Sequence, residues 1–187
     1  MRLLPGCMQK IKVIEVSGEP FDMGRQIGVK ARNYIRAGAG FYKKHWRALS
    51  GFSWEGSKRI LKPSFALLKK FIPRTEQELL GMAAGSGVDF GDLLAINFLE
   101  SLEAPRRKRK QREKCTSILT SAKRSKNGHL LHAHNEDWVA ADREWIYLIR
   151  AKPAGEPAFL AFTYGAWGIH YGVNSAGISL TADSQTG

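Results

Sequence analysis

The sequence predicts an α+β fold, in which a mainly helical first half precedes a β-rich second half. Through residues 20–100 the apolar residues recur at helical spacing, whereas after residue 115 they alternate with polar residues, as strands do. Turn-forming stretches at 126–128 and 174–177 separate the strand-like runs, and a basic run at 106–114 divides the halves. Helices segregated from an antiparallel sheet are typical of the α+β class.

The first half is expected to open with one strand, 11–16, because apolar and polar residues alternate there. Helices should follow over 21–46, roughly 57–71, from near Thr75 to 85–87, and from Asp89 toward Asn97. Pro73 should end the second of these helices. A capping box at 75–78 and an N-cap at Asp89 should begin the last two.

The second half is expected to form an antiparallel sheet. Its first two strands should be a hairpin around Asn127-Gly128, a dipeptide that accepts the positive φ angles of tight turns. The expected strands are 116–122, 129–136, 145–151, 158–164, 168–173 and 178–182.

Composition places the chain among ordinary globular proteins, with 187 residues, 43% of them hydrophobic and 25% charged. Its longest apolar runs, such as 65–68, are far short of the ~20 residues that cross a bilayer. The net charge of +12 is local, because the run 106–114 holds seven basic residues and one acid and so contributes half of it. The start of the chain lacks the apolar core of a signal peptide, so either the chain is intracellular, with a cytoplasmic or peroxisomal location expected, or its true N-terminus is missing.

Three interpretations of the basic run RRKRKQREK stay open. It is a solvated linker, a cluster for nuclear targeting or phosphate binding, or an exposed loop where the chain is cut. The run contains no aromatic residue on which bases would stack, so no specific nucleic-acid partner is expected.

Cysteine usage singles out one nucleophile candidate. The chain has two cysteines, too few for a disulfide framework, and Cys7 lies in a start without structural pattern. Cys115 begins a strand directly after the basic run, whose seven cations are expected to lower its pKa and favour the thiolate. The alternative is a small residue that merely opens a strand.

Histidines are the second group of candidates. His132 and His134 are two residues apart and share a face of their strand, as metal-binding H-x-H pairs do. No histidine follows this pair at metal-binding spacing, and apart from His170 we expect no cysteine or second histidine pair within its reach. We therefore predict a polar strand face and no metal site.

Six short segments occur in one order along residues 11–183, and together they resemble a known family. They are similar to the acyl-CoA:6-aminopenicillanate acyltransferase family of N-terminal nucleophile (Ntn) cysteine hydrolases. The matching segments are 17–28 (G-x-P-x-x-M/R-G-x-x-x-G), 78–90 (E-x-x-G-[IM]-A-x-G-[AS]-G-V), Asn97, 115–117 (C-T-[ST]), 135–138 (N-x-D-W) and 172–178 (G-x-N-x-x-G-[LIV]).

The resemblance implies an αββα sandwich, of which only the first part is present, and a chain truncated at its C-terminus. It divides the chain into a mainly helical pro-region (1–105), a basic processing linker (106–114) and the incomplete catalytic chain (115–187). The family's downstream oxyanion residue has no position here.

The resemblance also implies self-cleavage between Lys114 and Cys115 by an N-to-S acyl shift. The freed α-amine, whose pKa of ~7.7–8.0 is near working pH, then serves as the base for the Cys115 thiol. Asp137, on the partner strand, is expected to orient this amine.

The implied activity is that of an amidohydrolase or acyltransferase with no cofactor, although acyl-CoA is a candidate co-substrate. Its partners are a small amide or acyl-CoA substrate, and the two processed chains bind each other. A catalytically incomplete fragment, a non-enzymatic homologue and a basic nucleic-acid-binding module are the alternatives.

Some positions depart from the family pattern, and others are expected to support the site. His134 stands where bile-salt-hydrolase relatives carry Arg, and Asp183 stands where relatives often carry Asn. Lys114 replaces a small residue before the nucleophile. With Asn135 of the N-x-D-W segment, His134 and Asp183 are the expected substrate-binding or supporting residues.

Overall fold

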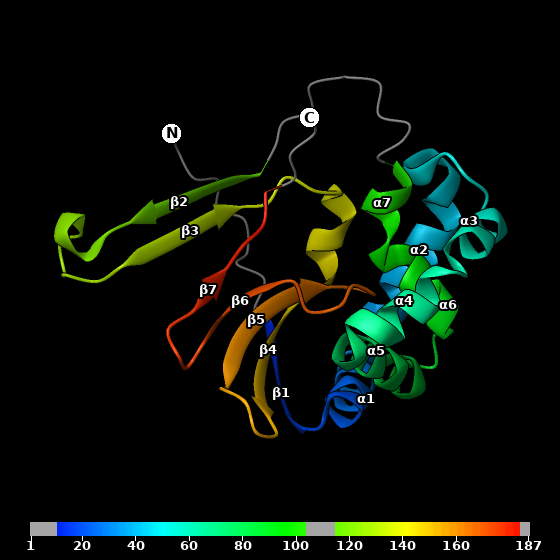
Figure 1. The fold of residues 1–187 in the computed structure, drawn as a ribbon. Helices are drawn as coiled ribbons and strands as arrows, with labels where there is room; N and C mark the ends of the chain where they lie inside the picture. The colour runs from blue at the N-terminus through cyan, green and yellow to red at the C-terminus, as the bar shows by residue number, and fades with distance from the viewer. Residues whose placement is uncertain (1–10, 104–114, 184–187) are drawn as a thin grey trace.

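Residues 11–103 and 115–183 are described by the structure, a computed structural model, and they form helical and β layers packed on each other (Figure 1). This arrangement confirms the α+β class. The basic run 106–114 and Lys114 lie outside the described residues, so the interpretations of that run stay predictions.

The main sheet has five strands in the order β1-β4-β5-β6-β7. Its strands are β1 (Lys12–Gly18), β4 (Ile146–Pro153), β5 (Phe159–Tyr164), β6 (Tyr171–Asn174) and β7 (Ser179–Leu180). The second-half strands β4 to β7 pair antiparallel, as expected, and β1 of the first half joins them by pairing with β4 in parallel, with Ile14 beside Ile149. Alternation predicts a strand but carries no information about its partner. As a result, segments on both sides of the basic run share one sheet.

The helices follow β1 and lie together on one side of this sheet (Figure 1). Their bounds are α1 (Pro20–Lys30), α2 (Arg32–Ser50), α3 (Trp54–Leu61), α4 (Ser64–Phe71), α5 (Pro73–Ser86), α6 (Phe90–Asn97) and α7 (Leu99–Glu103). Two expected helices are each divided, 21–46 at Ala31 and 57–71 at Pro63. A proline lacks the N–H that a helix interior requires, which explains the second break.

Local capping was predicted with mixed success. Gly87 ends α5 in the left-handed region, with φ of 74°, and the Asp89 side chain accepts a hydrogen bond from the Asp92 N–H at the start of α6. Both features match the expectation. The capping box at 75–78 is wrong, because α5 already begins at Pro73 and no side-chain cap forms there. Proline suits the first helical turn, where its missing N–H has no partner to lose.

The second sheet is the hairpin of β2 (Thr116–Thr120) and β3 (Leu131–Asn135). The strands are antiparallel, as expected, but a longer connection that contains a 3₁₀ turn (η2, Ala122–Arg124) replaces the tight turn. Within the Asn-Gly pair, only Gly128 has a positive φ, 69°. A type I′ turn requires positive φ at both central residues.

The hairpin contacts the main sheet at β6 and β7. Tyr147, Ile149 and Ala151 alternate along β4 and are fully buried in the core that packs against the helices. The hairpin lies over the opposite face, where His132 Nδ1 is 2.7 Å from the Ser179 Oγ of β7. Ser117 Oγ of β2 is likewise 3.0 Å from Thr181 Oγ1. The described layers are therefore helices, main sheet and hairpin.

Helices α1 and α5 approach so closely that backbone touches backbone. A Cβ on Gly24 of α1 would lie 1.9 Å from the Glu78 carbonyl oxygen, and one on Gly81 of α5 would lie 2.0 Å from the Phe21 oxygen. Gly28 and Gly85 make equally close approaches one turn further on. Glycines four residues apart thus allow the two helices to pack, which is the physical use of the G-x-x-x-G spacing in both segments.

Glycines in α2 play two different roles. Helix α2 continues through the stretch 37–40, and Gly38 meets the backbone of Gly165, whose Cα would be 2.9 Å from an added Cβ. Gly38 therefore allows α2 to lie close to the chain that follows β5. Gly40 has no atom within 4 Å of an added Cβ.

Among the described residues, no helix has both the length and the apolar character required to span a bilayer. This agrees with the expectation drawn from the short apolar runs.

A carboxyl group buried between α5 and the sheet makes the fold sensitive to pH. Burial raises the pKa of Glu78 to about 7, although the N–H of Ile169 hydrogen-bonds to it. An acid whose folded pKa exceeds its unfolded value destabilises the fold as pH rises from about 4.5 to about 7, here by up to about 3 kcal/mol. We expect Glu78→Gln to be more stable than the wild type at about pH 8 and close to it at about pH 4.

Urea denaturation at several pH values measures this difference. Glu76→Gln, which removes a carboxylate from the first turn of the same helix, is the matched control. A Glu78→Gln curve that runs parallel to the wild type throughout would contradict the prediction.

Candidate functional site

Cys115 lies immediately before β2 and is half-buried. Its Sγ accepts a hydrogen bond from the backbone N–H of Asp137, with 3.4 Å between sulfur and nitrogen. The strand start expected at Cys115 is therefore present, and the chain leaving β3 passes directly beside the thiol.

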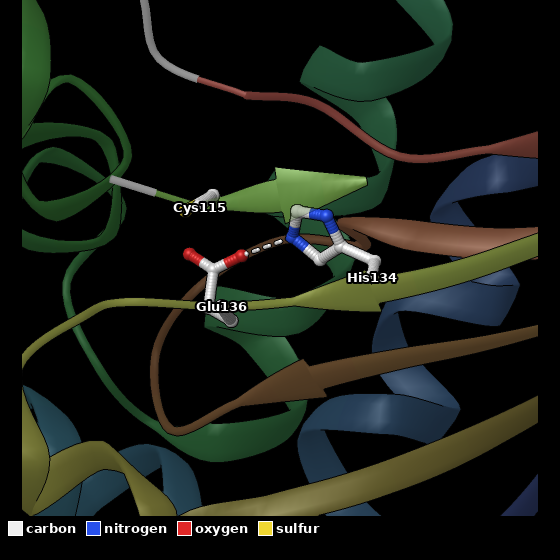
Figure 2. Close-up of side chains that lie close together, drawn as sticks. All are labelled: Cys115, His134 and Glu136. Carbon is white, nitrogen blue, oxygen red and sulfur yellow. Dashed lines mark hydrogen bonds and ion pairs between the residues drawn. The ribbon is translucent and has the colours of Figure 1, made fainter. Parts of the chain in front are cut away.

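The hairpin register determines which acid faces the thiol. Thr116 pairs with Asn135 and Ser117 with His134, so one further step places Glu136 opposite Cys115. Because side chains alternate between the faces of a strand, Cys115 shares its face with His134 and Glu136. Figure 2 shows these three side chains converging from the two strands of the hairpin.

His134 is held at both ring nitrogens. Nε2 lies 2.8 Å from Glu136 Oε2, and Nδ1 lies 3.0 Å from Ser117 Oγ and 3.6 Å from Asp183 Oδ1. The ring packs edge-on against Tyr171, with centroids 4.9 Å apart, and the side chain is only 6% exposed. The imidazole therefore has one orientation, which also fixes the Glu136 carboxylate.

The described surroundings of the Cys115 thiol raise its pKa. Burial raises the pKa of Cys115, and the negative charges of Glu136 and Asp183 raise it further, while the Asp137 N–H acts in the opposite direction. The lowering expected from the basic run stays a prediction, because that run lies outside the described residues. Burial is the largest of these effects on the pKa, and among the described residues it favours the thiol over the thiolate.

A pocket of about 180 Å³ opens next to Glu136. Aromatic rings form much of its wall, and burial lowers the pKa of His170, which stacks on Tyr164 with centroids 5.3 Å apart. The volume is below the roughly 300–1,000 Å³ of drug-sized sites, so only a small group fits. Its lining residues are Asn97, Glu100, Glu136, Trp138, Tyr164, Trp167, Ile169, His170 and Tyr171.

Buried hydrogen bonds support the pocket wall from the helical side. Trp138 Nε1 donates to the Tyr42 hydroxyl at 3.2 Å, and that hydroxyl donates to the Asp142 carboxylate. Burial raises the pKa of Asp142 to about 6. The network joins α2 to the 3₁₀ turn η3 (Ala140–Trp145) and holds the Trp138 ring against Trp167, with centroids 5.3 Å apart.

Asn97, one of the residues that carry the family resemblance, holds the opposite wall. Its Nδ2 donates to the Ala166 carbonyl at 3.2 Å, and its Oδ1 accepts from the Gly168 N–H at 2.8 Å. The end of α6 is thereby connected to the loop between β5 and β6. This loop contributes Trp167, Ile169 and His170 to the pocket.

The other sequence candidates lie in several environments. Asp137 is exposed and meets Cys115 through its backbone N–H, and the role expected for its carboxylate stays a prediction. Asn135 is exposed on the face of β3 that points away from the thiol, whereas Asp183 reaches His134. His132 does not join His134 in a metal pair, because its two nitrogens contact Ser179 and Thr181.

Sequence reasoning missed Glu136 as a functional residue. The information was present, because a hairpin that pairs Ser117 with His134 necessarily brings Glu136 opposite Cys115. The resemblance instead drew attention to the neighbouring aspartate of the N-x-D-W segment.

Comparison with known proteins adds no relative to this picture. No family model matches the chain, and no curated protein matches it either. The site must therefore be interpreted from its own geometry.

Proposed function

We propose that this chain is the precursor of an autoprocessed cysteine amidohydrolase or acyltransferase of the Ntn type, with Cys115 as its nucleophile. One observation carries the proposal. A cysteine at the start of a strand, directly after a basic run, faces a carboxylate that a buried histidine holds in place, and a pocket lies beside that carboxylate. Nucleophile, base and a third orienting group form the general pattern of covalent catalysis.

Self-cleavage is the first reaction of this site. Sγ of Cys115 attacks the carbonyl carbon of Lys114 while its proton passes to the Glu136 carboxylate. The carbon–nitrogen bond then breaks, and the nitrogen takes up that proton and leaves as the free α-amine of Cys115. Water hydrolyses the resulting thioester, which releases the Lys114 carboxylate and restores the thiol.

The raised pKa of Cys115 makes a proton acceptor necessary for this step. A thiol that stays protonated is a weak nucleophile unless a neighbouring base removes the proton during attack. An acceptor is close to the thiol. The Cys115 sulfur, a ring nitrogen of His134 and a carboxylate oxygen of Glu136 all lie within 4.8 Å of one another.

Substrate turnover follows once the amine is free. The α-amine accepts the thiol proton, and the thiolate attacks the carbonyl carbon of a linear amide or an acyl thioester such as acyl-CoA. The leaving group takes the proton, and the acyl group stays on sulfur until water or an acceptor amine removes it. The aromatic pocket beside Glu136 binds the acyl portion.

The layer order supports an αββα sandwich as the complete fold. Helices cover one face of the main sheet and the hairpin lies over the other, which is the order of the first three layers. Cleavage before Cys115 would also leave the two chains bound, because β1 and β4 come from opposite sides of the cut and pair over seven residues.

Intact-mass spectrometry of the expressed full-length protein tests the proposal. We expect a fragment that begins Cys115-Thr116-Ser117 in the wild type and only uncut chain in Cys115→Ala. The matched control is Cys7→Ser, which removes the other cysteine and should be cut as the wild type is.

Two outcomes would contradict the proposal. The same cut in Cys115→Ala would mean that a foreign protease recognises the basic run. An uncut wild type would favour the alternative, a non-catalytic homologue or incomplete fragment.

A further inference from the structure

The cluster beside the thiol also has the composition of a zinc site. Cys115 offers a sulfur, His134 a ring nitrogen and Glu136 a carboxylate oxygen, and these atoms all lie within 4.8 Å of one another. Sulfur, imidazole nitrogen and carboxylate oxygen are the ligands that zinc takes in proteins. Figure 2 shows the three side chains close together, with a dashed line between His134 and Glu136.

The spacing of the three groups suits tetrahedral coordination after small movements. Zinc–ligand distances of ~2.0–2.3 Å place neighbouring tetrahedral ligands about 3.4–3.7 Å apart. His134 Nε2 and Glu136 Oε2 are 2.8 Å apart and must separate slightly, while no other separation exceeds 4.8 Å, so none has to close by more than about 1 Å. Side-chain rotation accounts for both movements, so the backbone of the hairpin can stay as it is.

The histidine is already supported on its far side. A zinc-bound imidazole usually engages a hydroxyl, carbonyl or carboxylate through its second nitrogen, which fixes the ring. His134 Nδ1 has such partners in Ser117 Oγ at 3.0 Å and Asp183 Oδ1 at 3.6 Å. This support is independent of the ligand cluster itself and leaves Nε2 directed toward Cys115 and Glu136.

We propose that Cys115, His134 and Glu136 bind one zinc ion, with water as the fourth ligand, and that bound zinc holds the nucleophile inactive. Binding releases the thiol proton to solvent, so the zinc charge is balanced by the thiolate and the Glu136 carboxylate. The sulfur lone pair that would attack Lys114 is then donated to the metal. The inhibitory part rests on the proposed function, whereas the binding itself does not.

Cobalt and zinc titrations test the site in a Cys7→Ser background, where Cys115 is the remaining thiol. We expect one equivalent of Co²⁺ to produce the thiolate-to-cobalt charge-transfer absorption and one equivalent of Zn²⁺ to displace it. Cys115→Ser should abolish the band. His134→Ala and Glu136→Gln should each weaken zinc binding at least tenfold, since each removes a direct ligand.

His129→Ala is the control, because it removes an exposed histidine from the loop of the same hairpin. It should bind as the parent does. Far-UV circular dichroism of each variant separates loss of a ligand from loss of folding, and Ser117→Ala provides a milder test by removing support from His134. Unchanged affinity in Cys115→Ser or Glu136→Gln, or absence of the cobalt band in the parent, would overturn the site.

Self-cleavage measured with and without metal tests the inhibitory role. We expect zinc-loaded protein to stay uncut and a chelator to start cleavage. Equal cleavage rates in both states would overturn this role. If the protein is never cut, the proposed enzyme function fails, and the metal titration still decides the zinc site.

Discussion

Replacing Gly81 with alanine is expected to prevent the chain from folding stably. The added Cβ would lie 2.0 Å from the Phe21 carbonyl oxygen and 2.7 Å from the Arg25 nitrogen. Both are backbone atoms of α1, so no side chain can rotate to make room, and α1 and α5 would have to separate. Overpacking against adjustable side chains costs about 1–3 kcal/mol, and a backbone clash should exceed this. Such a loss is a large part of the ~5–15 kcal/mol that stabilises a typical domain.

Thermal melting followed by far-UV circular dichroism measures the effect. Gly40→Ala is a matched control, because it is the same substitution inside α2 with no atom within 4 Å of the new Cβ. That variant should gain about 0.5–1 kcal/mol, since alanine favours the helix over glycine. Similar melting temperatures for the two variants would contradict the close contact between α1 and α5.

Glu136→Gln is expected to slow self-cleavage by at least about 100-fold. Glutamine has the same shape and can still hydrogen-bond to His134, but it cannot accept the Cys115 proton. A positioned general base contributes roughly 10²–10⁴-fold to a rate, which sets the size of the expected loss. Quantifying the fragment that begins at Cys115 over time gives the rate directly.

Two further variants make the second prediction specific. Glu144→Gln changes the same charge at an exposed position and should cleave at the wild-type rate. Asp137→Asn compares the two neighbouring acids, because the Asp137 carboxylate was the expectation from the resemblance. If Asp137→Asn stops cleavage and Glu136→Gln does not, the assignment of Glu136 as the base is wrong.

Features that depend on a few neighbouring residues were predicted well. Asp89 caps α6 and Gly87 ends α5 as expected, because each involves contacts within one helical turn. Pro63 was overlooked as a break, although it acts in the same local way. The hairpin strands were found, but the length of their connection was not, since Asn127 does not adopt the positive φ that the tight turn requires.

Contacts between segments that are distant in the sequence could not be predicted from its pattern. The parallel pairing of β1 with β4 brings together residues more than a hundred positions apart, and alternation is the same whatever the partner. The backbone contact between Gly24 and Glu78 is of this kind as well. Each depends on which elements meet, which is decided by burial of the whole core.

The sequence by itself determined the α+β class, most of the elements and the place of Cys115 at the start of a strand behind a basic run. The tertiary structure decided the chemistry around that cysteine. The hairpin register placed Glu136 opposite the thiol, and burial raised the pKa of Cys115, with the charges of Glu136 and Asp183 acting in the same direction. The physical reason is that charge acts through distance in space, and the folded sheets set these distances.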